Sequence, residues 1–123
     1  MGFGEPSKVG ASITIEETEV FSDISPVAWT DLDLSAVVGA NYALVILKVN
    51  LQNTNTSVAF RKNGDTDEHF DSIGITTGIG AALFQPSDIG LHVIVVVLTD
   101  SGGIIEWKGE GLATTVDVIG FIK

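Results

Sequence analysis

The chain has 123 residues, 45% of them hydrophobic, so we expect one packed domain rather than disorder or two domains. Only 18% of the residues are charged, against about 25% in an average soluble domain, so part of the surface is expected to be covered by other protein. The 16 acidic and 6 basic residues give a formal net charge of −10, which argues against nucleic acid and anionic membranes as direct partners. The absence of cysteine rules out disulfides, iron–sulfur clusters, thiol catalysis and cysteine-type zinc sites.

The first segment, residues 1–11, is predicted to be an extended N-terminal arm, because it contains two early glycines and Pro6. It has no basic region followed by an apolar stretch, so we expect no signal peptide, and Pro6 stands where an N-myristoylation signal needs Ser or Thr. The longest aliphatic runs, Ala43–Leu47 and Val93–Leu98, are far shorter than the about 20 residues of a membrane-spanning helix. We therefore expect a chain that is soluble as made.

Residues 12–123 are predicted to form one domain of β-strands. Short segments rich in β-branched residues alternate with Gly, Asn, Asp, Ser and Pro, and helical spacing of apolar residues is nearly absent. The pattern predicts strands near Ser12–Glu17, Val27–Leu34, Tyr42–Asn50, Ser57–Lys62, Ile79–Phe84, Leu91–Thr99, Ile104–Gly109 and Thr115–Ile122. About eight strands with 14 glycines favour a single antiparallel β-sandwich of the jelly-roll kind.

Two hairpins are predicted from the connections between strands. Val93–Leu98 is followed by a short loop of Thr, Asp, Ser and Gly and then by Ile104–Trp107. Glycine in such a loop supplies the positive φ that hairpin turns need. The second predicted hairpin joins Tyr42–Asn50 to Ser57–Lys62 across a polar turn.

Two central strands are apolar on both faces. A sandwich strand normally alternates between apolar residues that face the core and polar residues that face water. Ala43–Val49 does not alternate until Lys48, and Leu91–Leu98 is apolar on both faces except at His92. One face of each strand can form the core, so the other face needs a different cover.

The last predicted strand, Thr115–Ile122, has the same character. Alternation places one set of apolar residues on one side (Val116, Val118 and Ile122) and a second set on the other (Ile119 and Phe121). A long loop, the N-terminal arm or a neighbouring subunit would cover the second face. The low charged fraction favours the subunit, so we expect a homo-oligomer, with self-coverage in a monomer as the alternative.

The most polar stretch, Arg61–Asp71, offers four carboxylates of the kind that Ca²⁺ prefers, from Asp65, Asp67, Glu68 and Asp71. The EF-hand pattern is not met, because Gly64 stands between the first two ligands, Asn63 and Asp65, and no Glu closes the loop. The favoured interpretation is a turn at Asn63–Asp65 followed by a solvated acidic loop. A calcium site remains the alternative.

No catalytic residue is predicted. The 2 histidines, His69 and His92, lie in no nucleophile or metalloprotease motif. His92 lies within an aliphatic strand and is expected at a core edge or an interface, and His69 is expected in a solvated loop. Residues two apart in a strand share a face, so Asp31 and Asp33 are expected to form an outward polar stripe beside Leu32 and Leu34. Glu16 and Glu17 are a nominal pair of carboxylates without further support for glycoside hydrolysis.

Phosphate and sugar sites find little support. Gly78-Ile79-Gly80 lacks the following Lys and the helix of a phosphate-binding loop. Trp29, Trp107 and Tyr42 are expected to anchor the core or an interface, and a glycan-stacking platform is the alternative. No cofactor or metal is predicted.

Four segments together resemble small β-sandwich modules of tailed-bacteriophage virion proteins: Trp29–Ser35, Val38–Val49, Ala59–Asp65 and Val97–Trp107. The resemblance covers residues 27–122 and consists of patterns of turns and strands. The proteins concerned are capsid decoration proteins and the C-terminal modules of tail or fibre proteins.

The resemblance implies a non-enzymatic structural protein of the virion that acts by shape. It implies a homo-oligomer, with a trimer favoured, that contacts a capsid or tail protein and carries no catalytic residues. A receptor- or glycan-binding module of a tail or fibre is one alternative function. A subunit of an extracellular filament or surface layer, which would polymerise openly, is another.

Overall fold

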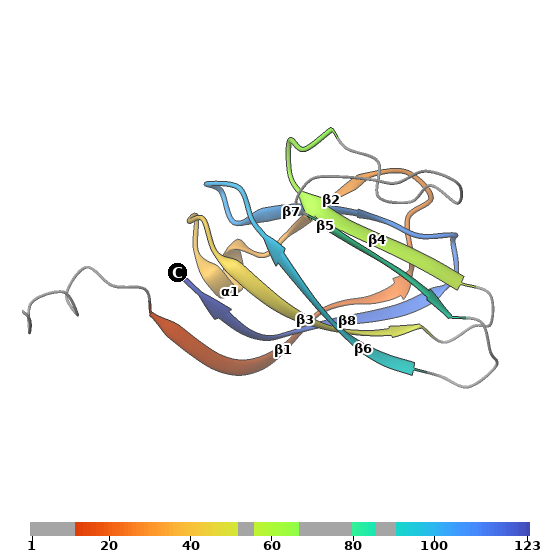
Figure 1. Ribbon diagram of the computed structural model, residues 1–123, viewed down its shortest axis with the longest axis horizontal. Coiled ribbons are helices and arrows are strands. Elements are labelled where there is room, and N and C mark those ends of the chain that lie inside the picture. The colour runs from red at the N-terminus through yellow and green to blue at the C-terminus, as the bar shows by residue number, and fades with distance from the viewer. Residues whose placement is uncertain (1–11, 52–55, 67–79, 86–90) are drawn as a thin grey trace, which may run out of the picture.

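The computed structural model describes residues 12–51, 56–66, 80–85 and 91–123. The segment predicted to be an N-terminal arm, residues 1–11, lies outside the described residues, as do Asp67, Glu68, His69, Asp71, Gly78 and Ile79. The described residues form eight strands and one four-residue helix, α1 (Ser35–Val38) (Figure 1). The strands are β1 (Ile13–Ile24), β2 (Thr30–Asp33), β3 (Leu44–Leu51), β4 (Thr56–Lys62), β5 (Gly80–Gln85), β6 (Leu91–Leu98), β7 (Ile104–Lys108) and β8 (Ala113–Ile122).

The strands form two four-stranded sheets that face each other, with strand orders β1-β8-β3-β6 and β2-β7-β4-β5 (Figure 1). β1 pairs with β8, β2 with β7, β3 with β6 and β4 with β5, and every pair is antiparallel. This arrangement results when one long two-stranded ribbon is rolled up so that successive strand pairs alternate between the sheets, which is the jelly roll. The predicted all-β antiparallel sandwich is therefore confirmed.

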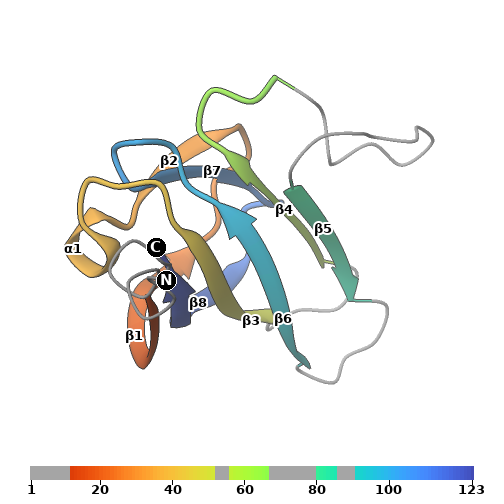
Figure 2. The same ribbon diagram turned by 60° about the vertical axis from the view of Figure 1, so that its left-hand side comes forward.

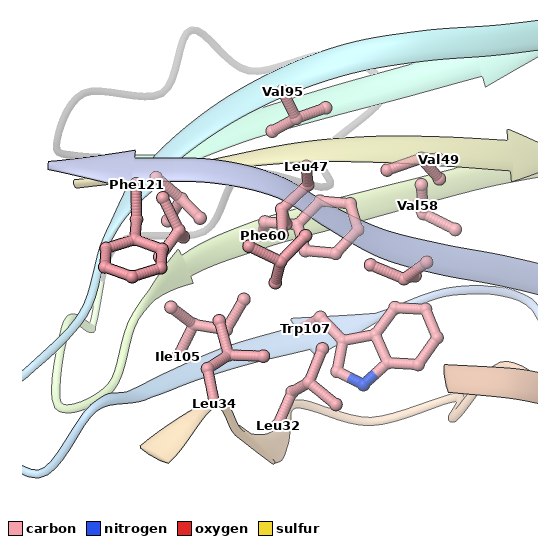
Figure 3. Packing of buried hydrophobic residues seen from close by; sticks show 14 of the residues in the cluster. Leu32, Leu34, Leu47, Val49, Val58, Phe60, Val95, Ile105, Trp107 and Phe121 are labelled. Carbon is pink, nitrogen blue, oxygen red and sulfur yellow. The ribbon is translucent and has the colours of Figure 1, made fainter. Parts of the chain in front are cut away.

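The core lies between the sheets and is built around Trp107 (Figure 3). The Trp107 ring stacks on Phe60 with ring centroids 5.7 Å apart, and meets Phe21 edge-on at 4.6 Å. Both geometries are favourable for aromatic pairs. Aliphatic side chains from both sheets, among them Leu47 and Ile105, close the core around these rings.

Both predicted hairpins are wrong. β6 pairs with β3 in one sheet, whereas β7 pairs with β2 and β4 in the other. β3 and β4 likewise belong to different sheets. The turn residues are the same in a hairpin and in an arch that crosses from one sheet to the other, so local sequence does not distinguish them. Burial against distant strands decides which strands pair.

The predicted facing of the last strand is also wrong in part. A register shift in the β3–β8 ladder brings Phe121 onto the same side as Val116 and Val118, where all three are buried. Ile122 then points to the outer face instead. One extra residue in a strand reverses the facing of everything after it, and strict alternation does not reveal such a bulge.

β1 is longer than predicted. The expected strand ended at Glu17, and the real one continues to Ile24. Two register shifts, between Ile15 and Thr18 and between Glu19 and Phe21, interrupt the period of two that marks a strand. The short helix α1 was not predicted either, since four residues are too few to show helical spacing.

Candidate functional site

The outer face of the sheet β1-β8-β3-β6 carries large apolar side chains. In β3 alternate residues such as Val45 and Leu47 are buried in the core, so Leu44 and Ile46 point to the outer face. β6 behaves in the same way, because Val95 and Val97 are buried while Ile94 and Val96 are exposed. These strands were predicted to be apolar on both faces, and the structure confirms it.

Strand register aligns the outward residues in two rows across all four strands. The first row contains Ile13, Ile122, Leu44 and Leu98, and the second contains Ile15, Gly120, Ile46 and Val96. Ile94 adjoins the second row on β6. We call this set the apolar face: Ile13, Ile15, Leu44, Ile46, Ile94, Val96, Leu98 and Ile122.

Much of this apolar face is accessible to solvent. Ile15 is 87% exposed and Ile13 70%, and at the other side of the sheet Ile94 is 54% exposed. Single exposed apolar residues are ordinary, but contiguous apolar patches on a soluble chain mark contact surfaces. Two aligned rows of aliphatic side chains form such a patch.

The same outer face becomes polar further along the strands. The third row contains Glu19, Asp117 and Lys48 beside Ile94, and the fourth contains Ser22, Thr115, Asn50 and His92. The Lys48 Nζ donates to Glu17 Oε2 at 2.8 Å and lies 3.7 Å from Asp117 Oδ2. The hydrogen bond and charge of Lys48 lower the pKa of Glu17, and Glu17 in turn raises the pKa of Lys48. The outer face is thus divided into an apolar half and a charged half.

The acidic stretch forms the predicted turn in its described part. Asp65 donates its backbone N–H to the Lys62 carbonyl, and Gly64 has a φ of 90°. The Asn63 Nδ2 donates to Asp100 Oδ2 at 2.8 Å, so the side chain of this residue, a candidate ligand of the hypothetical calcium site, is bound to a carboxylate of another loop. Within the described part of the chain, no group of three or more acidic or histidine side chains is placed to hold a metal.

The predicted polar stripe on β2 is confirmed. Asp31 and Asp33 are exposed, and Leu32 and Leu34 between and after them are buried. Glu17 is used in the ion pair with Lys48. His92 lies exposed at the outer edge strand β6, opposite Asn50.

The three candidate aromatic residues lie in different environments. Trp107 is 1% exposed and belongs to the core, so it is inaccessible to a sugar. The Trp29 ring faces the guanidinium of Arg61 at 3.9 Å and the amine of Lys108 at 5.4 Å, and Arg61 also donates to Glu106. Tyr42 is 61% exposed and precedes β3. The structure therefore does not gather these rings into one stacking platform.

Sequence reasoning missed the contribution of β1 to the apolar face. Ile13 and Ile15 stand two apart before a run of acids, which is the pattern of one apolar strand face. The described residues include no helix long and apolar enough to cross a membrane. No family model, no curated protein and no solved structure matches this chain.

Proposed function

We propose that this protein is a non-enzymatic structural subunit of a virion. It forms a homo-oligomer and acts through contacts with a capsid or tail protein, as a decoration or minor structural subunit. A trimer is the closed form that the resemblance to phage virion modules implies. The observation that supports the proposal is the apolar face, which two aligned rows of aliphatic side chains extend across a whole sheet.

The energetic reason is the cost of leaving this face in water. Each Å² of apolar surface that becomes buried contributes roughly 25 cal/mol, before the losses of translational and side-chain freedom on association. The exposed fractions of Ile13, Ile15 and Ile94 show that this surface is available in the single chain. The charged half of the same face, where Lys48 pairs with Glu17, opposes burial against another chain and limits how far the contact extends.

The test compares two substitutions on the same strand and the same outer face. Ile15→Asp places a charge in the apolar half, and Ser22→Asp places one in the polar half beside Thr115. We expect Ile15→Asp to lower both the mass measured by light scattering and the amount bound to purified virus particles, because a desolvated carboxylate opposes burial. Ser22→Asp should leave both unchanged.

Three results would count against the proposal. A wild-type chain that is monomeric at micromolar concentration contradicts the homo-oligomer. Open polymers of unlimited length favour the filament or surface layer. Binding to a glycan array that Trp29→Ala removes favours the receptor-binding module.

A further inference from the structure

Strand β6 forms an edge of its sheet, and its own sequence carries none of the features that usually blunt an edge. It pairs with β3 along its full length, Leu91 to Leu98, with no register shift, and no strand lies on its other side among the described residues. Figure 2 shows it on the side of the sandwich away from β1. Natural edges are commonly blunted by charges, bulges, proline or short length. β6 has eight residues and contains no acid, lysine, arginine or proline.

The other described edges are protected differently. β1 has two register shifts and several acidic residues, among them Glu17 and Glu19. β2 has four residues and carries Asp31 and Asp33. β5, the edge of the opposite sheet on the same side as β6, has six residues. β6 is therefore the longest described edge without charge or bulge.

The ladder geometry shows which groups of β6 face the open side. The Thr99 N–H donates to the Ala43 carbonyl at 2.9 Å, so the backbone of Thr99 faces β3. Backbone direction alternates along an antiparallel strand. Val95 and Val97 therefore bond to β3, and the alternate residues of the strand direct their N–H and C=O groups to the free edge. The edge-facing residues are His92, Ile94, Val96 and Leu98.

We propose that β6 of one copy pairs antiparallel with β6 of a second copy about a two-fold axis at Val95. This contact joins the two sheets β1-β8-β3-β6 into one continuous eight-stranded sheet. It deepens the proposed homo-oligomer, on which it rests for the existence of self-association. It names the strand, the register and the symmetry of the contact.

The register follows from the edge-facing residues. With the axis at Val95, Ile94 of one copy lies opposite Val96 of the other, and His92 lies opposite Leu98. All four edge-facing residues then form hydrogen-bonded pairs. A shift of the axis to Ile94 or to Val96 moves part of the pairing beyond the ends of β6. Opposed residues share a face, so Ile94 meets Val96 and the apolar faces of the two copies become continuous, while His92 meets Leu98 at each end of the pairing.

The absence of carboxylates from β5 and β6 favours a second copy of this chain as the occupant. Each chain carries a net charge of −10, so two copies repel wherever their carboxylates oppose each other. β6 and the neighbouring edge strand β5 (sequence GAALFQ) contain no acidic residue. Among the described residues, these two strands let two identical acidic chains approach without directly opposing carboxylates. An edge-to-edge pair about a two-fold axis also closes on itself and does not propagate.

The first experiment uses the absence of cysteine in the wild-type chain. Ile94→Cys and Val96→Cys are made separately and mixed in equal amounts under mild oxidation. Hydrogen-bonded partners in an antiparallel pair have Cα atoms about 5.5 Å apart, which suits a disulfide. We expect the mixed disulfide to form faster than either homodimer, whose cysteines lie diagonally about 7–8 Å apart. Ser22→Cys on β1 is the control and should remain uncross-linked with either partner.

The second experiment blocks the edge without adding charge. Val96→Pro removes an edge-facing N–H in each copy and places the ring in the path of a partner strand, while the ladder to β3 keeps its bonds. We expect the dissociation constant, measured by sedimentation, to rise at least about tenfold. Val96→Thr keeps the N–H and should raise it less. The near-ultraviolet circular dichroism of the buried Trp107 reports whether Val96→Pro is folded.

The outcomes separate this contact from the proposed function. A particle of two copies contains the β6 pair, and so does a particle of six copies in which β6 pairs join two trimers. A particle of three copies does not contain it. If a three-copy particle is unaffected by Val96→Pro, the β6 pair is overturned while the homo-oligomer stands. Equal cross-linking of Ser22→Cys overturns the register. If Val96→Pro dissociates the copies and Ile15→Asp does not, the β6 pair is supported and the proposed role of the apolar face in self-association is contradicted.

Discussion

Asp100 holds the turn between β6 and β7. Its Oδ1 accepts the backbone N–H groups of Gly102 and Ile104, at 2.8 and 3.0 Å, and its Oδ2 accepts the Asn63 amide. Partial burial of the carboxylate raises its pKa, but these hydrogen bonds outweigh that effect and the pKa of Asp100 is lowered. A residue predicted only as part of a polar loop thus connects two turns that are distant in the sequence.

The lowered pKa gives a pH dependence of known sign. The folded state binds the Asp100 proton more weakly than the unfolded chain, so the stabilisation is complete above the unfolded pKa and is lost as pH falls through the folded pKa. We expect Asp100→Asn to lower the free energy of unfolding by about 1–1.5 kcal/mol at neutral pH. The difference from wild type should shrink below about pH 4. Thermal unfolding followed from pH 7 to pH 2 measures this.

Asp31→Asn is the matched control, since Asp31 is an exposed carboxylate on β2. It should change the unfolding free energy by less than about 0.5 kcal/mol. A constant difference between Asp100→Asn and wild type over the whole pH range would show that the carboxylate charge does not contribute.

At the scale of elements, the arches between sheets depend on close backbone approach. Gly103, in the turn before β7, has a φ of 78°, and its carbonyl accepts the Leu34 N–H at 2.9 Å. A Cβ at this position would collide with the Gly39 carbonyl oxygen and lie 3.2 Å from the Ser35 Cα. The turn therefore packs directly against α1 and the segment that follows it.

Two glycine substitutions separate steric crowding from backbone strain. Gly64 also has a positive φ, of 90°, but a Cβ there would meet nothing within 4 Å. We expect Gly64→Ala to cost about 1–2 kcal/mol through its left-handed backbone. Gly103→Ala should cost a further about 1–3 kcal/mol because of the collision with backbone atoms. Urea unfolding of both variants measures the two values, and equal losses would contradict the close approach.

The strands themselves were largely predictable, and their pairing was not. All eight expected strands overlap real ones, because β-branched runs between glycine and polar turns are local signals. The prediction of a hairpin between β6 and β7 was wrong, because a short loop of this kind fits an arch between sheets equally well. The predicted facing of Phe121 was wrong, because the bulge that reverses it depends on how β8 packs on β3.

At the scale of the whole molecule, a net charge of −10 opposes self-association through contacts that are otherwise apolar. Salt screens charges separated by more than the Debye length, about 30 Å at 0.01 M and about 10 Å at 0.1 M, and leaves apolar burial in place. We expect the association of the wild-type chain to become tighter as sodium chloride rises from about 0.01 to about 0.3 M. Light scattering at fixed protein concentration measures this. Dissociation at high salt would show that charge pairs, and not apolar surfaces, hold the copies together.

The all-β fold and the strands with two apolar faces could be predicted from the amino-acid sequence alone. These properties follow from composition and from alternation along short segments, which are local. Strand pairing could not be predicted in this way, because it depends on contacts between residues far apart in the chain. The folded structure aligns Ile13, Ile122, Leu44 and Leu98 into one row and leaves β6 at an edge. Register across four strands is a property of the assembled sheet, and no single strand carries it.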